Sequence, residues 1–153
     1  LFITEANNLT VRALDLDALV VTTVAGKAPA DPRHFCENIS PVLPPECGAD
    51  DGIGTAARFR FPFGVADDTQ GGAFVVDSHN NLIRHFSPST GAVTSVAGVQ
   101  ETVLDDFGRP SLESTPTQAG TFSHPSHALF LPPDRLLVAD RSANCIREVT
   151  LAR

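Results

Sequence analysis

Three copies of one pattern, an acidic residue followed seven positions later by an arginine, constrain the fold of this chain more than any other feature. The pairs are Glu5 with Arg12, Asp77 with Arg84, and Asp140 with Arg147. An apolar run precedes each acid, and a β-branched residue precedes each arginine. Arg12 and Arg84 both lie fourteen residues before a glycine that ends a Val-Ala-Gly triplet. A repeat in fixed register predicts one supersecondary unit that is copied along the chain.

The middle copy shows what this unit contains. Short apolar runs alternate with clusters of Gly, Pro, Asn, Asp and Ser, and no stretch has sustained helical spacing. The runs cover residues 62–66, 73–76, 82–86 and 92–97. Strands of this length between such turns predict a four-stranded antiparallel meander, so the fold class is all-β.

The spacing of acid and arginine has two structural interpretations. In the first, a hairpin centred on Asn80-Asn81 places Asp77 opposite Arg84, and the resulting ion pair contributes roughly 0.2–1 kcal/mol. In the second, the acid accepts hydrogen bonds from backbone N–H groups of the turn. Both interpretations give the pairs a structural role, and neither indicates a catalytic role.

Together these marks make the chain resemble the NHL repeat, a β-propeller blade motif. In the middle copy the matching residues are Ala57-Arg58-Phe59, Pro62, Gly64-Val65-Ala66, Asp77-Ser78, Ile83-Arg84 and Val96-Ala97-Gly98. The third copy supplies Gly120-Thr121-Phe122, Pro125, Val138-Ala139-Asp140 and Ile146-Arg147. Two departures from the family pattern are Glu5 in place of Asp and Ser126-His127-Ala128 in place of Gly-Val-Ala.

The resemblance implies blades of four-stranded meanders arranged around an axis. It divides the chain into blade 1 at residues 1–26, an insert at 27–51, blade 2 at 52–98, an insert at 99–118 and blade 3 at 119–153. This gives three, four and three strands, or about two and a half blades. Propellers close with about 4–8 blades. We therefore expect an incomplete ring, part of a six-bladed propeller that is completed by more of the same chain or by another copy.

Charge and hydropathy exclude some classes of function. The net charge of −7 and the isoelectric point near 5.0 argue against a nucleic-acid-binding surface. No run of eighteen apolar residues occurs, so we expect no membrane insertion within this segment.

Cysteine and asparagine bear on the cellular compartment. Cys36 and Cys47 lie in the Pro-rich first insert, where a disulfide would staple a loop that lacks a core of its own. Free or metal-binding cysteines are the alternative, although the local spacing matches no zinc pattern. Asn8 and Asn38 begin glycosylation triplets. Together these features predict an extracellular or secretory-pathway protein, with Cys145 as an unpaired strand thiol.

The two inserts suggest where a function resides. Both join the outermost strand of one blade to the innermost strand of the next, so both lie on one face of a propeller. Long loops on rigid scaffolds are common binding sites, although such loops are also tolerated without a function. We expect a non-enzymatic protein-interaction or assembly module whose partner is a protein or the remaining blades.

Enzymatic and metal-dependent alternatives rest on few residues. Related propellers include lyases that hold zinc with histidines, and His124 begins a strand near the axis. His124 and His127 point to opposite faces of a regular strand, however, so both cannot bind one ion. The acidic pairs Asp50-Asp51 and Asp105-Asp106 are weak calcium candidates. We expect no catalytic, cofactor-binding or metal-binding residues in this segment. The alternative is a propeller lyase or hydrolase whose metal site is completed by residues outside this chain.

Overall fold

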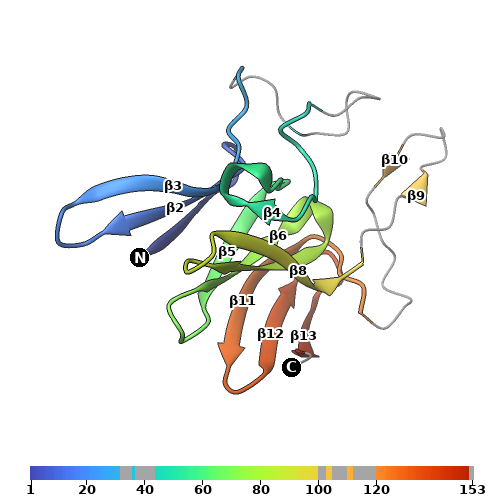
Figure 1. Cartoon of the computed structure of the whole chain (residues 1–153). Helices are drawn as coiled ribbons and strands as arrows, with labels where there is room; N and C mark the ends of the chain where they lie inside the picture. The colour runs from blue at the N-terminus through green and yellow to red at the C-terminus, as the bar shows by residue number, and fades with distance from the viewer. Residues whose placement is uncertain (32–35, 37–43, 100–102, 105–109, 112–119, 152–153) are drawn as a thin grey trace.

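The computed structural model describes residues 1–31, 36, 44–99, 103–104, 110–111 and 120–151. Its principal strands form three antiparallel sheets that lie in succession, drawn blue, green to yellow, and orange to red in Figure 1. Sheet 1 contains β1 (Phe2–Glu5), β2 (Thr10–Asp15) and β3 (Val20–Gly26), and sheet 3 contains β11 (Pro125–Leu131), β12 (Arg135–Asp140) and β13 (Cys145–Thr150). The fold is all-β and resembles part of a propeller.

Sheet 2 is the largest of the three. It has the order β4-β8-β7-β6-β5 and contains β4 (Gly52–Ile53), β5 (Pro62–Asp67), β6 (Ala73–Asp77), β7 (Leu82–Ser87) and β8 (Ala92–Gly98). The predicted four-stranded meander is present as β5 to β8. The lead-in residues Gly52 and Ile53 pair with Val93 and Ala92 and add a short fifth strand at the outer edge.

The other elements are short. The 3-10 turns are η1 (Gly54–Ala56) and η2 (Ser78–Asn80). Within the second insert, β9 (Val103–Leu104) pairs with β10 (Pro110–Ser111). Ten longer strands remain in the described part of the chain, arranged as three, four and three, as the repeat predicts.

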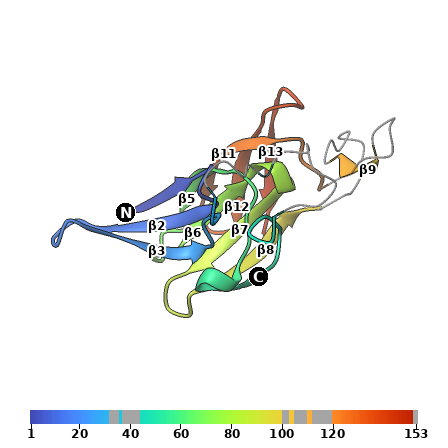
Figure 2. The ribbon, with the colours of Figure 1, turned by 90° about the horizontal axis from the view of Figure 1, so that it is seen from above.

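The hydrophobic core lies between successive sheets rather than within one of them. One cluster joins Val11 and Ala25 of sheet 1 to residues of sheet 2, and another joins sheet 2 to sheet 3. Strand β6 is buried along its whole length, because Val75 faces the first cluster while Phe74 and Val76 face the second. A strand that is covered on both faces needs a continuous apolar run, which explains why β6 does not alternate. Figure 2 shows this succession of sheets from above.

An aromatic ring and a glycine close each junction between sheets. Phe59 packs beside Gly26 at the end of β3, and Phe122 packs beside Gly98 at the end of β8. Both glycines have positive φ angles, +83° and +95°, which residues with a Cβ rarely adopt. A Cβ on either glycine would also lie 2.2 Å from a backbone oxygen, so the repeated Val-Ala-Gly ending has a steric cause.

Candidate functional site

The segments that precede β5 and β11 lie against the β6–β7 and β12–β13 turns at one end of the sheets. Backbone bonds repeat this contact, since His79 donates its N–H to the Arg60 carbonyl and Ser142 donates to the Ser123 carbonyl, both at 3.0 Å. We call this end the lead face; it comprises residues 58–61, 78–81, 123–124 and 141–144. The first insert also contacts it, because Asn80 Nδ2 donates to the Gly48 carbonyl at 2.7 Å. The first insert thus lies against the face on which the repeat predicted it to lie.

The Asp77–Arg84 pair is hydrogen-bonded to residues of this face and is fully buried. Arg84 Nη1 lies 3.0 Å from Asp77 Oδ2, and both side chains have zero exposure. The other carboxylate oxygen accepts the backbone N–H of Arg60 at 2.7 Å. Arg84 also donates to the Arg58 and Asp50 carbonyls and forms an ion pair with Asp51 at 2.8 Å. One buried guanidinium therefore holds the insert, the lead segment and the hairpin together.

The predicted register of this hairpin was wrong. Asp77 pairs with Leu82, and Arg84 pairs with Val75, so the acid and the arginine are diagonal rather than opposite. The reason is the turn: residues Ser78–Asn80 form a 3-10 turn and Asn81 is left-handed, so four residues rather than two separate the strands. Diagonal positions share one face of the sheet, which still allows long side chains to meet.

Neither interpretation of the acid was complete. Asp77 takes part in the ion pair and also accepts a backbone N–H, but that N–H comes from the lead segment seventeen residues earlier and not from the turn. Asp140 repeats the arrangement, because its Oδ1 accepts the N–H of Ser123 at 2.7 Å while its Oδ2 accepts from Arg147 Nε. This repeated geometry fastens the lead segments of sheets 2 and 3 to their own hairpins.

The Glu5–Arg12 and Asp77–Arg84 pairs differ in their exposure to solvent, and the pKa values of their acids shift in opposite directions. Glu5 and Arg12 are partly exposed at 3.1 Å, and the hydrogen bond from Thr10, with the nearby Arg12, lowers the pKa of the Glu5 carboxyl. Complete burial instead raises the pKa of Asp77 to about 6, although the charge of Arg84 opposes this effect. An acid paired with arginine thus has a lowered pKa where it is partly exposed and a raised pKa where it is buried, because desolvation disfavours the charged carboxylate.

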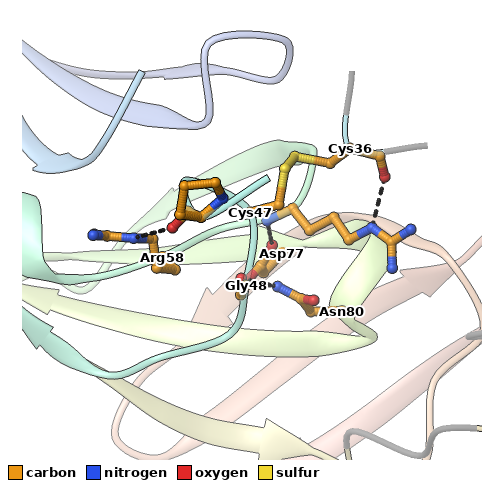
Figure 3. Close-up of a disulfide and its surroundings, with 8 residues drawn as sticks. Cys36, Cys47, Gly48, Arg58, Asp77 and Asn80 are labelled. Atoms are coloured by element: carbon orange, nitrogen blue, oxygen red, sulfur yellow. Dashed lines mark hydrogen bonds between the residues drawn. A yellow bond between two sulfur atoms is a disulfide. The ribbon is translucent and has the colours of Figure 1, made fainter. Parts of the chain in front are cut away.

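A disulfide joins Cys36 to Cys47, the two cysteines of the first insert (Figure 3). Their Cα atoms are 5.8 Å apart, and both residues are buried against Leu9 and Phe61. The backbone of Cys47 also forms an isolated bridge with Phe59. The remaining cysteine, Cys145, is a free thiol and is exposed on β13.

Carbonyl groups of the insert accept hydrogen bonds from arginine side chains of the segment that precedes β5 (Figure 3). Arg60 Nε donates to the Cys36 carbonyl at 2.8 Å, and Arg58 Nε donates to the Pro45 carbonyl at 3.0 Å. Arg58 also caps the carbonyls of Thr55, Ala56 and Ala57. The arginine pair therefore fixes the described part of the insert on the lead face.

Sequence reasoning missed several of these contacts. Arg60 had no repeat partner, since Ser123 takes its place in the third copy, and its burial depends on a tertiary contact with Cys36. Asn80 was expected only to form a turn, yet its amide bridges Asp77 and Gly48. A polar residue in a turn carries no sign in the sequence that a distant loop will cover it.

An aromatic stack of Phe61, His79 and His124 occupies the lead face beside the disulfide. The Phe61 and His79 rings are 4.3 Å apart, and the His79 and His124 rings meet edge to face at 5.1 Å. Burial lowers the pKa of His79 to about 4, with the positive charges of His124, Arg60 and Arg141 adding to the effect. The His79 imidazole is therefore neutral at pH 7 and can act as a hydrogen-bonding or ligating group.

The other histidines and acids considered as metal ligands do not gather at one place. His127 is exposed on β11, and His85 Nε2 is hydrogen-bonded to Asp68 Oδ2 at 2.8 Å. In the part of the chain that the structure describes, no three His, Cys, Asp or Glu side chains are grouped closely enough to hold a metal ion. Asp105-Asp106 lies outside the described residues.

The two glycosylation triplets are placed differently. Asn8 is exposed in the β1–β2 turn, where a sugar can be attached without displacing the core. Asn38 lies outside the described residues. No described helix is both long enough and apolar enough to cross a membrane.

Comparisons with known proteins show the fold alone. No family model matches the sequence, and a search of curated proteins finds no match. Solved structures from Bacteroides thetaiotaomicron are similar over 99% of this chain: a structural-genomics protein of unknown function (20% identity, TM-score 0.68), an auxiliary nutrient binding protein (20%, 0.62) and a provisionally assigned phosphatase (19%, 0.63). The chain spans about a third of their lengths, at 32%, 35% and 32% respectively.

Proposed function

We propose that this chain is a segment of an NHL-type β-propeller and serves an extracellular or secretory-pathway protein as a non-enzymatic interaction or assembly module. The observation that carries the proposal is that hydrogen bonds and a disulfide hold the described part of the first insert against the lead face. Its Cys36 and Pro45 carbonyls bind buried or half-buried arginines, and the Cys36–Cys47 disulfide cross-links it. A surface whose described backbone is held in place before a partner docks loses less conformational entropy on docking, which favours recognition.

The setting outside the cytoplasm is supported by the same disulfide, since such bonds persist in oxidising compartments. Attachment of a sugar at Asn8 would follow in that setting, and it would also crowd one border of the lead face. A partner is therefore expected to approach over the disulfide and the sheet 2 and sheet 3 turns rather than over the β1–β2 turn.

A recovery experiment with two matched cysteine variants tests the proposal. The wild-type chain, the Cys36→Ala/Cys47→Ala variant and the Cys145→Ala variant are immobilised and exposed to extracellular fluid from the source organism. A specific partner should bind the wild type and Cys145→Ala alike, and binding to the double variant should be about tenfold weaker, because the loop must then be ordered on binding. Circular dichroism establishes that the sheets persist in all three proteins.

If the immobilised wild type and a folded double variant recover the same proteins in equal amounts, the result would contradict this function. Discovery of a turnover reaction that the double variant retains would also contradict it, since the activity would then lie elsewhere.

A second candidate function, a propeller lyase or hydrolase segment, is favoured by the contact between His79 and His124. The neutral imidazole of the β6–β7 turn, beside the imidazole that precedes β11, offers two ligands to a metal site that further residues outside this chain would complete. Elemental analysis of the intact protein tests this candidate. Zinc that is bound in a one-to-one ratio and lost in His124→Ala would support this candidate. Absence of zinc from the intact protein, with the same zinc content in His124→Ala, would contradict it.

A further inference from the structure

The lead face carries a charge opposite to that of the chain as a whole. In the complete sequence Asp and Glu outnumber Lys and Arg by 18 to 11. The lead face contains neither Asp nor Glu, whereas five of its residues are basic: Arg58, Arg60, His79, His124 and Arg141. A basic patch on an acidic protein attracts anionic groups and directs them to one face.

The acids that lie next to this face are occupied by other contacts. Asp77 and Asp140 accept backbone N–H groups of the lead segments, and each also pairs with the arginine of its own repeat. The side chains of both acids have zero exposure. Asp51 pairs with the same arginine as Asp77, and Asp50 lies beside Gly48 of the first insert. The outer surface of the lead face therefore keeps its positive charge.

The effect of this charge is evident at His79. Burial lowers the pKa of its imidazole, and the positive charges of His124, Arg60 and Arg141 lower the pKa further. The described groups that act on this imidazole include no acid. Because a nearby negative charge would raise the pKa instead, the electrostatic potential at this point of the face is positive.

Only some of these basic groups are within reach of a partner. Arg58 and Arg60 donate to carbonyls of the first insert, and Arg60 is only 3% exposed. Arg141 is exposed in the β12–β13 turn, and its side chain forms no hydrogen bond or ion pair with any residue that the structure describes. The exposed Ser142 follows it, with its hydroxyl 3.4 Å from Nδ1 of the half-buried His124.

We propose that Arg141, Ser142 and His124 form a binding site for a carboxylate, which an acidic segment of a protein partner supplies. The planar guanidinium of Arg141 donates two parallel hydrogen bonds to such a group, and the Ser142 hydroxyl donates another. The imidazole of His124 adds a further polar group beside this hydroxyl. This inference rests on the interaction part of the proposed function and names the chemistry of the partner.

The place of Arg141 in the sequence distinguishes it from the arginines of the repeat. It directly follows Asp140, whereas Ser78 and Ala6 follow the corresponding acids of the other two copies. The ion pair with Asp140 is made by Arg147, so the repeat contact does not need a second arginine. The charge of Arg141 is therefore available to a partner.

An acidic protein segment suits this site better than a nucleic acid does. Nucleic-acid binding depends on the neutralisation of many phosphates by Lys and Arg. The site offers one exposed arginine, and the net charge of −7 repels a long polyanion from the rest of the chain. A short segment with a few carboxylates requires complementary charge at one place only, which Arg141 provides.

Fluorescence anisotropy with two matched peptides tests the proposal. In the probe peptide Glu alternates with Gly and Ser, and in the control peptide Gln replaces every Glu. Binding is measured for the wild type, Arg141→Gln, Arg141→Lys and Arg135→Gln. Arg135 is the matched arginine, because it is also exposed but lies at the end of β12 away from the lead face, where it pairs with Glu148. Both Gln variants change the net charge equally.

We expect the Glu peptide to bind the wild type at low salt, with an affinity that falls as salt is added. Arg141→Gln should bind it about tenfold more weakly, because charge-assisted hydrogen bonds to the carboxylate are lost. Arg141→Lys should retain part of the affinity, and Arg135→Gln should alter it less than about twofold. Circular dichroism should be the same for all four proteins, since both arginines are exposed.

Three results would overturn the proposal. The first is the absence of binding of the Glu peptide to the wild type at low salt, or equal affinities for the Glu and Gln peptides. The second is an equal loss of affinity in Arg141→Gln and Arg135→Gln. The third is a thymidine oligonucleotide that binds more tightly than the Glu peptide and depends on Arg141, which would identify a nucleic acid as the partner.

This outcome is separable from that of the proposed function. Arg141 and Ser142 belong to the β12–β13 turn, so the Cys36→Ala/Cys47→Ala variant should bind the Glu peptide with unchanged affinity. If the peptide binds through Arg141 but no partner depends on the disulfide, only the proposed role of the first insert fails. If a disulfide-dependent partner is recovered and the Glu peptide does not bind, only the carboxylate site fails.

Discussion

Asp77 joins two segments of the chain through its two carboxylate oxygens, one bonded to the Arg60 backbone N–H at 2.7 Å and the other to Arg84 Nη1 at 3.0 Å. Asp77 and Arg84 are both inaccessible to solvent. A buried ion pair contributes little net stability compared with an apolar pair, but removal of one member leaves an uncompensated charge. The behaviour of this pair should therefore differ sharply from that of Glu5 and Arg12, which water reaches.

Substitution of the buried arginine should be far more destabilising than substitution of the exposed one. Arg84→Met is expected to lower the free energy of unfolding by about 3–5 kcal/mol, because Asp77 then loses its counter-charge in a dry site. Arg12→Met, the matched control, should cost at most about 1 kcal/mol. Urea denaturation followed by circular dichroism measures both values. Similar costs for the two variants would show that Asp77 is hydrated in solution.

The raised pKa of Asp77 predicts a specific dependence of stability on pH. In the native state this carboxyl holds its proton up to about pH 6, whereas the unfolded chain releases it near the ordinary value of 3.8. The native state therefore binds more protons between these values, and the contribution of Asp77 to stability falls as the pH rises from about 4 to about 6. Above that range the contribution is constant.

The comparison variant Asp77→Asn isolates this effect from the other carboxyls. The stability of the wild type relative to Asp77→Asn should decline by on the order of 2–3 kcal/mol across that range. Denaturation midpoints at a series of pH values provide the measurement. A difference that stays flat, or that grows with pH, would refute the raised pKa.

Gly98 and Gly71 offer a matched test of the junction between sheets. Both have positive φ angles, +95° and +91°, but a Cβ at Gly98 would lie 2.2 Å from the Asn81 carbonyl oxygen, while nothing lies within 4 Å at Gly71. Gly71→Ala should cost about 1 kcal/mol from backbone strain alone. Gly98→Ala adds the steric clash and should cost at least about 2 kcal/mol more. Thermal unfolding distinguishes them, and equal costs would exclude close packing at this junction.

The disulfide should stabilise the insert without determining the fold of the sheets. Loss of the cross-link in Cys36→Ala/Cys47→Ala is expected to lower the free energy of unfolding by about 2–3 kcal/mol, because the unfolded loop regains conformational freedom. Peptide mapping of the oxidised wild type should find Cys36 joined to Cys47 and Cys145 alkylated. Free thiols at Cys36 and Cys47 in protein from an oxidising compartment would contradict the pairing and the compartment together.

Local patterns were sufficient for the repeat, and they were insufficient for the register of its hairpins. The alternation of apolar runs and turns places the ten long strands because strand formation depends on neighbouring residues. The spacing of Asp77 and Arg84 did not reveal whether two or four residues form the turn. That choice follows from the left-handed Asn81 and from bonds between the turn and Arg60, which are far apart in the sequence.

The sequence by itself determined the all-β repeat, the three acid–arginine pairs and the apolar run of β6, since each is written in residues close together in the chain. Only the tertiary structure decided that the Arg84 side chain is inaccessible to solvent while that of Arg12 is partly exposed. It also decided that Arg60 binds the carbonyl of Cys36. The exposure of Ile146, at a position where Val11 and Ile83 are buried, was likewise decided by tertiary contacts. The physical reason is that burial depends on which distant segment covers a residue, and identical motifs receive different cover at successive positions of the fold.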